Sequence, residues 1–121
     1  MPFVYTTNLS EVRALAEQHA RTAGLSASRI SDFVIAVSEI AANTVRHARS
    51  AGSMDIWSDA EQIVCEMRDA GFIADPLAGS RPPPEGARGG HGLWLVHQVC
   101  DSVVLQSDEN GTVIRMSMWL R

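Results

Sequence analysis

The chain has 121 residues, 45% of them hydrophobic and 20% charged, which suits a single domain over residues 1–121 with one core. Its formal charge of −4 lacks the basic footprint needed for a phosphate backbone, which argues against nucleic-acid binding. Neither a secretion signal nor an apolar run near the roughly 18 residues of a membrane span is present, so we expect a cytoplasmic protein away from membranes.

The N-terminal part predicts a short strand followed by a helix. Residues 3–7 favour the strand, and Asn8 followed by Glu11 is typical of a capping box that opens a helix. The helix is expected to run to about residue 23, because Gly24 stands where a left-handed C-terminal cap is needed.

A second helix is predicted from Ser26 or Ser28 to about Ala48. One arc of it is expected to face the core and holds Ile30, Phe33, Val34, Val37, Ile40, Ala41, Thr44 and Ala48. The opposite arc is expected to be polar and holds Asp32, Ala36, Glu39, Asn43 and Arg46.

The middle of the chain predicts a hairpin and then a long loop. Residues 54–58 and 62–68 alternate as strands, with a connection short enough for antiparallel pairing. Residues 74–90 are crowded with proline and glycine, which exclude a helix or a central strand. A loop of this length favours a functional lid.

The C-terminal part predicts a short helix over residues 93–100 and a second hairpin, residues 103–107 and 112–120, around Asn110-Gly111. The element order is β-α-α-β-β-loop-α-β-β. It predicts an α+β fold, a two-layer α/β sandwich with three helices on one face of a mixed, mostly antiparallel sheet.

Glu39 and Asn43 lie one helical turn apart on the polar arc, so both side chains can point at one ligand. The amide oxygen of Asn43 suits Mg²⁺, and Glu39 is suited to accept a proton from a nucleophilic hydroxyl. A solvated polar face is the alternative for this pair.

Asp69-Ala70-Gly71 follows the strand of residues 62–68. The Asp69 carboxylate only accepts hydrogen bonds, so it suits the amino group of adenine, and Gly71 lets a flat ring approach the backbone. An Asx turn at the end of a strand is the alternative.

Gly89-Gly90-His91-Gly92-Leu93 opens the short third helix. Free N–H groups and the helix dipole at this end suit phosphate, and the glycines permit its close approach. The residues that surround these glycines support neither a dinucleotide fingerprint nor a P-loop.

These motifs, in this order and together with Gly111-Thr112, resemble the ATP-site boxes of the GHKL superfamily. The resemblance implies ATP and Mg²⁺ as cofactors. It implies that Asn43 binds the metal and that Asp69 and Gly71 recognise adenine. It also implies that the backbone of residues 90–93 binds the phosphates and that Thr112 supports the contact to adenine.

Within this superfamily, residues 38–48 are most similar to anti-sigma-factor serine/threonine kinases. That similarity implies that Glu39 is the general base and that the substrate is an anti-sigma factor antagonist of the STAS type. It further implies a sigma factor as a second partner and a possible homodimer.

The alternative function is a degenerate GHKL binding module that holds a regulatory partner without phosphotransfer. Ile73 stands where the family's first glycine box has a second glycine, and the lid is short and rich in proline. Both features favour the binding module. A histidine kinase is disfavoured, because two long helices already committed to the sandwich leave none for a phosphoacceptor hairpin.

Overall fold

The computed structural model describes residues 2–48, 51–71 and 91–120. In chain order the elements are β1 (Phe3–Tyr5), α1 (Leu9–Ala23), α2 (Ala27–Asn43), a π-helical turn (Thr44–Ala48), β2 (Gly52–Ser58), β3 (Gln62–Asp69), α3 (His91–Val99), β4 (Ser102–Asp108) and β5 (Gly111–Trp119). The predicted lid, residues 74–90, lies outside the described residues.

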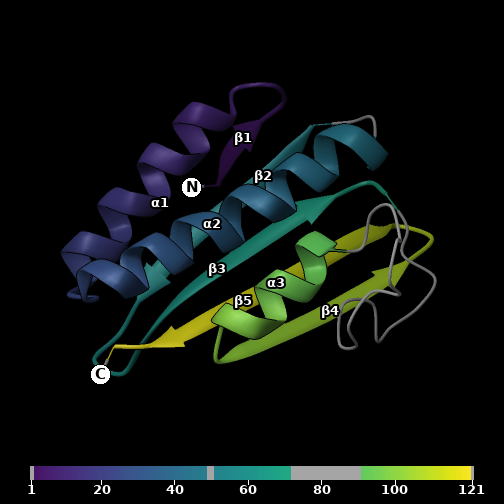
Figure 1. Ribbon diagram of the computed structural model, residues 1–121. Helices are drawn as coiled ribbons and strands as arrows, with labels where there is room; N and C mark the ends of the chain where they lie inside the picture. The colour runs from purple at the N-terminus through teal and green to yellow at the C-terminus, as the bar shows by residue number, and fades with distance from the viewer. Residues whose placement is uncertain (1, 49–50, 72–90, 121) are drawn as a thin grey trace.

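The strands form one sheet in the order β1-β2-β3-β5-β4, and every pairing among them is antiparallel. Both expected hairpins are confirmed, because β2 pairs with β3 and β4 pairs with β5. Figure 1 shows α1, α2 and α3 on one side of the sheet. The other side, which none of the described helices covers, is called the open side below. The predicted two-layer sandwich is therefore confirmed.

Helix α1 ends as the sequence predicts but begins differently. Gly24 adopts a left-handed conformation with φ of 96° and its N–H bonds the last carbonyls of the helix, as a glycine cap does. The capping box is absent, because the Asn8 side chain accepts from Thr6 N–H at 2.8 Å instead of from the helix. Asn8 still contacts Glu11, but as a donor to its carboxylate.

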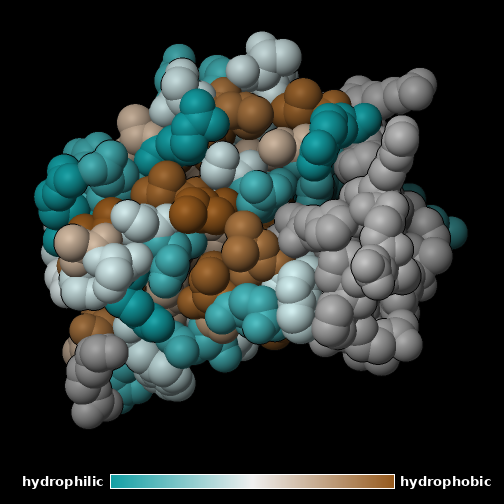
Figure 2. Space-filling view, in the orientation of Figure 1, coloured by the Kyte–Doolittle hydropathy of each residue, from teal (hydrophilic) through white to brown (hydrophobic). Residues whose placement is uncertain are grey.

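Helix α2 starts at a cap formed by Ser26, whose Oγ accepts from Arg29 N–H at 3.4 Å. Ala36 was expected on the polar arc, and that prediction is wrong, since Ala36 is fully buried and Ile35 is 44% exposed. The physical reason is that α2 packs against α1, α3 and β3, so more than one arc is covered. In Figure 2, apolar surface gathers over α2 and α3 and is bordered by polar residues.

The core lies between the helices and the sheet. Its largest fully buried side chains are Tyr5, Phe33, Ile40, Ile63, Met67, Met116, Met118, Val12, Val37, Val96 and Cys65. Cys65 and Cys100 are free and buried. Trp57 and Trp119 lie outside this core, 39% and 51% exposed on the open side of the sheet.

Among the helices that the structure describes, none combines the length and the apolar character needed to cross a lipid bilayer.

Candidate functional site

Asp69 is the last residue of β3, and both of its carboxylate oxygens are already engaged by the protein. Oδ1 accepts from Gly71 N–H at 2.7 Å, and Oδ2 accepts from the Thr44 hydroxyl at 3.0 Å. The Asx turn, which the sequence allowed as an alternative at Asp69, is therefore present. A carboxylate oxygen has two lone pairs, so each one of Asp69 retains a lone pair for a ligand donor.

Thr112 holds the turn that follows Asp69. It is the register partner of Asp69 on β5, it is buried, and its hydroxyl donates to the Gly71 carbonyl at 2.8 Å. Because that hydroxyl has one proton, Ser107 donates in the 2.7 Å contact between the two side chains. Asp69, Gly71 and Thr112, three residues proposed to surround adenine, thus form one hydrogen-bonded group.

Gly111, at the start of β5, allows this group to pack closely. Its φ is 131°, and a Cβ at this position would overlap the carbonyl oxygen of Asp69. Only glycine meets both requirements, the positive φ and the missing side chain.

The C-terminal end of α2 places the polar arc, with Glu39 and Asn43, next to the Asp69 group. Glu39 and Asn43 are half-buried and lie one turn apart, and Thr44, which bonds Asp69, directly follows Asn43. The next turn is a π-helix, Thr44–Ala48, an irregularity that is frequent at functional sites.

The Asn43 amide oxygen accepts from the Arg46 guanidinium at 2.7 Å. An amide oxygen and a nearby carboxylate are the donor types that Mg²⁺ takes from proteins, so the residue types fit this metal. The oxygen has a second lone pair, but a guanidinium beside it repels a cation. Arg46 therefore has to move away before Asn43 can hold Mg²⁺.

The expected phosphate site begins α3. The backbone of His91, Gly92 and Leu93 forms the first turn of this helix, which packs against α2, whereas Gly90 lies outside the described residues, as does Ile73. Figure 1 shows the start of α3 at the same end of the molecule as the ends of α2 and β3 and the turn between β4 and β5.

The structure thus links the β3 end, the β5 start and the α2 end by hydrogen bonds, with the α3 start at the same end of the fold. Sequence reasoning missed two residues here. Thr44 was assigned to the apolar arc and Tyr5 to a plain strand, yet the Tyr5 hydroxyl donates to Thr44 Oγ1 at 3.2 Å. A hydroxyl residue on an apolar arc directly after Asn43 is the signal that could have indicated Thr44.

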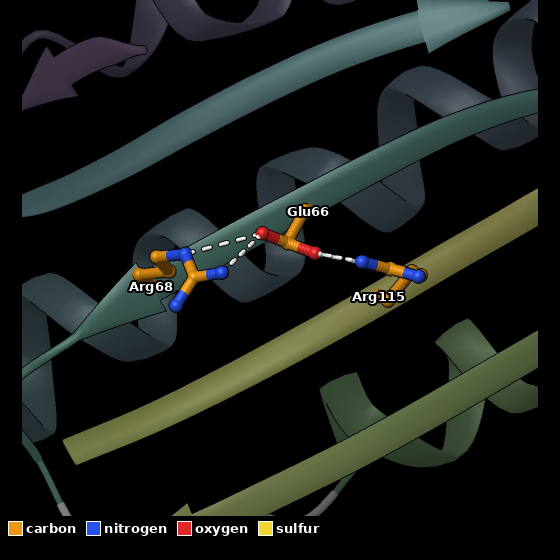
Figure 3. Close-up of polar contacts among 3 residues, drawn as sticks. All are labelled: Glu66, Arg68 and Arg115. Carbon is orange, nitrogen blue, oxygen red and sulfur yellow. Dashed lines mark hydrogen bonds and ion pairs between the residues drawn. The ribbon is translucent and has the colours of Figure 1, made fainter. Parts of the chain in front are cut away.

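A second charged cluster lies on the open side of the sheet, away from Asp69. Figure 3 shows Glu66 on β3 between Arg68 and Arg115. Its carboxylate forms salt bridges of 2.6 Å with Arg68 and 2.5 Å with Arg115. The hydrogen bond from Arg115 lowers the pKa of Glu66, and Arg68 adds to this against an opposing effect of burial. The Arg115 guanidinium also lies 5.5 Å from the Trp57 ring centroid, a cation–π contact. This cluster joins β2, β3 and β5 and does not contribute to the site.

Comparison with known proteins identifies the family. The model of the family described as histidine kinase-like ATPase domain matches residues 5–118 of the chain. Serine-protein kinase RsbW of Halalkalibacterium halodurans is 30% identical over 122 residues, which cover 91% of this chain and 75% of the relative.

Solved structures agree with the fold. The structure of the RsbU and RsbW domains of Rv1364c from Mycobacterium tuberculosis has a TM-score of 0.64 and 18% identity, over 98% of this chain but 32% of that one. The catalytic domain of histidine kinase ThkA has a TM-score of 0.62 and 15% identity, over 98% of this chain and 95% of its own. The chain therefore belongs to the histidine kinase-like ATPase domain family, the GHKL type, for which nucleotide binding is the shared property.

Proposed function

We propose that this chain binds ATP with Mg²⁺ and phosphorylates a serine or threonine of an anti-sigma factor antagonist of the STAS type. The observation that carries the proposal is the Asp69 carboxylate, which is fixed at the end of β3 by Thr44 and Gly71 with one lone pair left on each oxygen. A fixed acceptor beside a glycine backbone suits the amino group and flat ring of adenine. The name of the relative from Halalkalibacterium halodurans, a serine-protein kinase, supports the reaction type.

At the other end of the nucleotide, Glu39 and Asn43 have separate roles. Asn43 would hold Mg²⁺ through its amide oxygen, and the metal would neutralise charge on the phosphates. Glu39 accepts the proton of the attacking serine or threonine hydroxyl, while the oxygen of that hydroxyl forms a bond to the γ-phosphorus. The bond between that phosphorus and the bridging oxygen breaks, and ADP leaves. The backbone of residues 90–93 at the start of α3 would cradle the phosphates, and Thr112 would support the adenine contact.

Nucleotide binding is tested by calorimetric titration of the wild type and Asp69→Asn with ADP and ATP, with and without Mg²⁺. Loss of a charged acceptor costs about 1.5–3 kcal/mol, so Asp69→Asn should bind roughly 10- to 100-fold more weakly. Asp59→Asn is a matched control, since Asp59 caps the distant turn between β2 and β3. Absence of heat in all four titrations of the wild type would refute nucleotide binding.

Phosphotransfer is tested separately, by incubation with labelled ATP and candidate STAS proteins. Loss of a general base lowers a rate by about 100- to 10,000-fold, so Glu39→Ala should label the partner slowly while its ADP affinity stays near that of the wild type. Glu61→Ala removes an exposed carboxylate between β2 and β3 and should leave the rate unchanged. Equal rates for Glu39→Ala and the wild type would remove Glu39 from the mechanism.

The second candidate function is a binding module that holds a partner without phosphotransfer. The contact between Arg46 and Asn43 favours it, because a guanidinium occupies the oxygen expected to meet the metal. Nucleotide binding without labelling of any STAS partner would favour the module over the kinase.

The proposed partners follow from the same family. A STAS-type antagonist would be the substrate, a sigma factor would be sequestered, and the role would be transcription regulation in the cytoplasm. Homodimer formation is also proposed, and light scattering on the purified chain at several concentrations tests it directly.

A further inference from the structure

A line of side-chain contacts runs from the edge strand β1 to Asp69. The Tyr5 hydroxyl donates to Thr44 Oγ1 at 3.2 Å, and Thr44 Oγ1 lies 3.0 Å from Asp69 Oδ2. Tyr5 is 1% exposed and Thr44 is 3% exposed, so water does not compete for these contacts. Neither residue belongs to the motifs that indicated the nucleotide site.

The number of protons available decides which way these hydrogen bonds point. The Thr44 hydroxyl has one proton and two acceptors in reach, the Ile40 carbonyl at 3.2 Å and Asp69 Oδ2 at 3.0 Å. Burial raises the pKa of Tyr5 to about 12, so its phenol stays protonated and donates to Thr44. With Tyr5 donating, the proton of Thr44 goes to the carboxylate, the closer and stronger acceptor.

A glycine makes room for this arrangement. Gly52 is the register partner of Tyr5 on β2, and a Cβ at this position would overlap the Tyr5 ring. Gly52 begins β2, and its missing side chain permits the close approach of the ring. The chain thus places the phenol where its hydroxyl reaches Thr44.

We propose that Tyr5 and Thr44 are positioning residues that fix the orientation of the Asp69 carboxylate, and thereby favour adenine over guanine. The proposal rests on the proposed function, in which Asp69 reads the base. Guanine presents two adjacent donors, which suit a carboxylate with both oxygens free, whereas the amino group of adenine needs only one. In this site Gly71 holds one oxygen of Asp69 and Thr44 holds the other, so the carboxylate cannot turn both remaining lone pairs toward two adjacent donors.

The proposal is tested by titrating ADP and GDP into the wild type, Tyr5→Phe, Thr44→Val and Thr44→Ser. Thr44→Val removes the donor to Asp69, so ADP should bind roughly 3- to 10-fold more weakly, and the ratio of ADP to GDP affinity should fall. Tyr5→Phe should shift the ratio in the same direction by a smaller factor, because Thr44 is then free to turn its proton to Ile40. Thr44→Ser keeps the hydroxyl and should restore the ratio.

Val12→Ala is the control for a loss of stability alone, since Val12 is fully buried on α1 without a polar contact to the site. It should lower the melting temperature and leave the ratio of affinities unchanged. If Thr44→Val does not fold, the nearly isosteric Tyr5→Phe decides the question. A wild-type protein that binds ADP, with an unchanged ratio in both variants, overturns this proposal and leaves the proposed function standing. A wild type that binds neither nucleotide overturns both.

Discussion

Arg46 contacts the oxygen of Asn43 that is proposed to hold the metal. Its guanidinium is 2.7 Å from the Asn43 amide oxygen and is exposed to solvent. Removing it by Arg46→Met frees the oxygen and takes away a repelling charge, so Mg²⁺ should strengthen ADP binding more in the variant than in the wild type, by roughly 3- to 10-fold. Titration of ADP with and without Mg²⁺ measures this factor for each protein.

Arg21→Met is the control for Arg46→Met, because it removes the same charge at a distant position. Arg21 pairs with Glu17 on the exposed side of α1. It should leave the effect of Mg²⁺ unchanged. A smaller effect of Mg²⁺ in Arg46→Met would mean that Arg46 contacts the phosphates instead, which would contradict the competition inferred from the structure.

Substitutions at two glycines with positive φ distinguish the cost of backbone strain from the cost of a clash near the site. Gly24 caps α1 with φ of 96° and open space around it, whereas Gly111 has φ of 131° and lies against the Asp69 carbonyl. Gly24→Ala should cost about 1–2 kcal/mol of unfolding free energy and leave ADP affinity intact. Gly111→Ala should cost more and should weaken ADP binding, because the added Cβ displaces the β3 end. Urea unfolding and ADP titration of both variants provide the measurements, and equal ADP affinities would contradict the role of Gly111.

The salt bridges of Glu66 stabilise the pairing of β3 with β5 in a way that depends on pH. Arg115 and Arg68 lower the pKa of Glu66 in the folded chain below the ordinary value of 4.5. Since the folded pKa is the lower one, the stabilisation is present above pH 4.5 and is lost as the pH falls through the folded pKa. Both arginines are more than half exposed, so Glu66→Gln should cost about 0.2–1 kcal/mol at pH 7.

Urea unfolding at pH 7 and at successively lower pH tests this dependence, with Glu17→Gln as the control for an exposed pair within one helix. The difference between the wild type and Glu66→Gln should shrink in acid. A difference that grows as the pH falls would contradict the assigned sign.

For the whole molecule, local signals in the sequence were sufficient to predict the elements and their order. The turn at Asn110-Gly111 and the glycine cap at Gly24 depend on neighbouring residues alone, and both are confirmed. The burial of Ala36 and the exposure of Trp57 depend on which faces other elements cover, and a periodicity does not report this.

The same distinction applies to the candidate site. Asp69 and Thr112 are brought together by the register of two strands, which alternating patterns approximately define. Tyr5 and Thr44 are 39 residues apart in the chain, and their contact arises only when β1 has paired with β2 at the edge of the sheet. No local pattern around Tyr5 distinguishes it from an ordinary strand residue. Tyr5 therefore could not be predicted as a supporting residue, whereas Thr44 could have been, from its hydroxyl directly after Asn43.

The buried cysteines offer a measure of how the two layers open. Burial raises the pKa of Cys100 to about 12 and raises that of Cys65 further, and the thiolate is the form that reacts. Cys65 is fully buried on the central strand β3, whereas Cys100, at the end of α3, is 9% exposed. In native protein at pH 8, iodoacetamide should therefore modify Cys100 first and Cys65 only through global unfolding, as mass spectrometry would resolve.

If nucleotide binds the folded chain alone, ADP should protect Cys65 by mass action. At about 100 times its dissociation constant, ADP adds about 2.7 kcal/mol to the unfolding free energy, so modification of Cys65 should slow by roughly 100-fold. Asp69→Asn at the same ADP concentration should show much weaker protection, because the ligand then occupies a smaller share of the folded molecules. Rapid modification of Cys65 in the absence of ADP and denaturant would contradict its place in the core, since a thiol between the two layers is reached only when they separate.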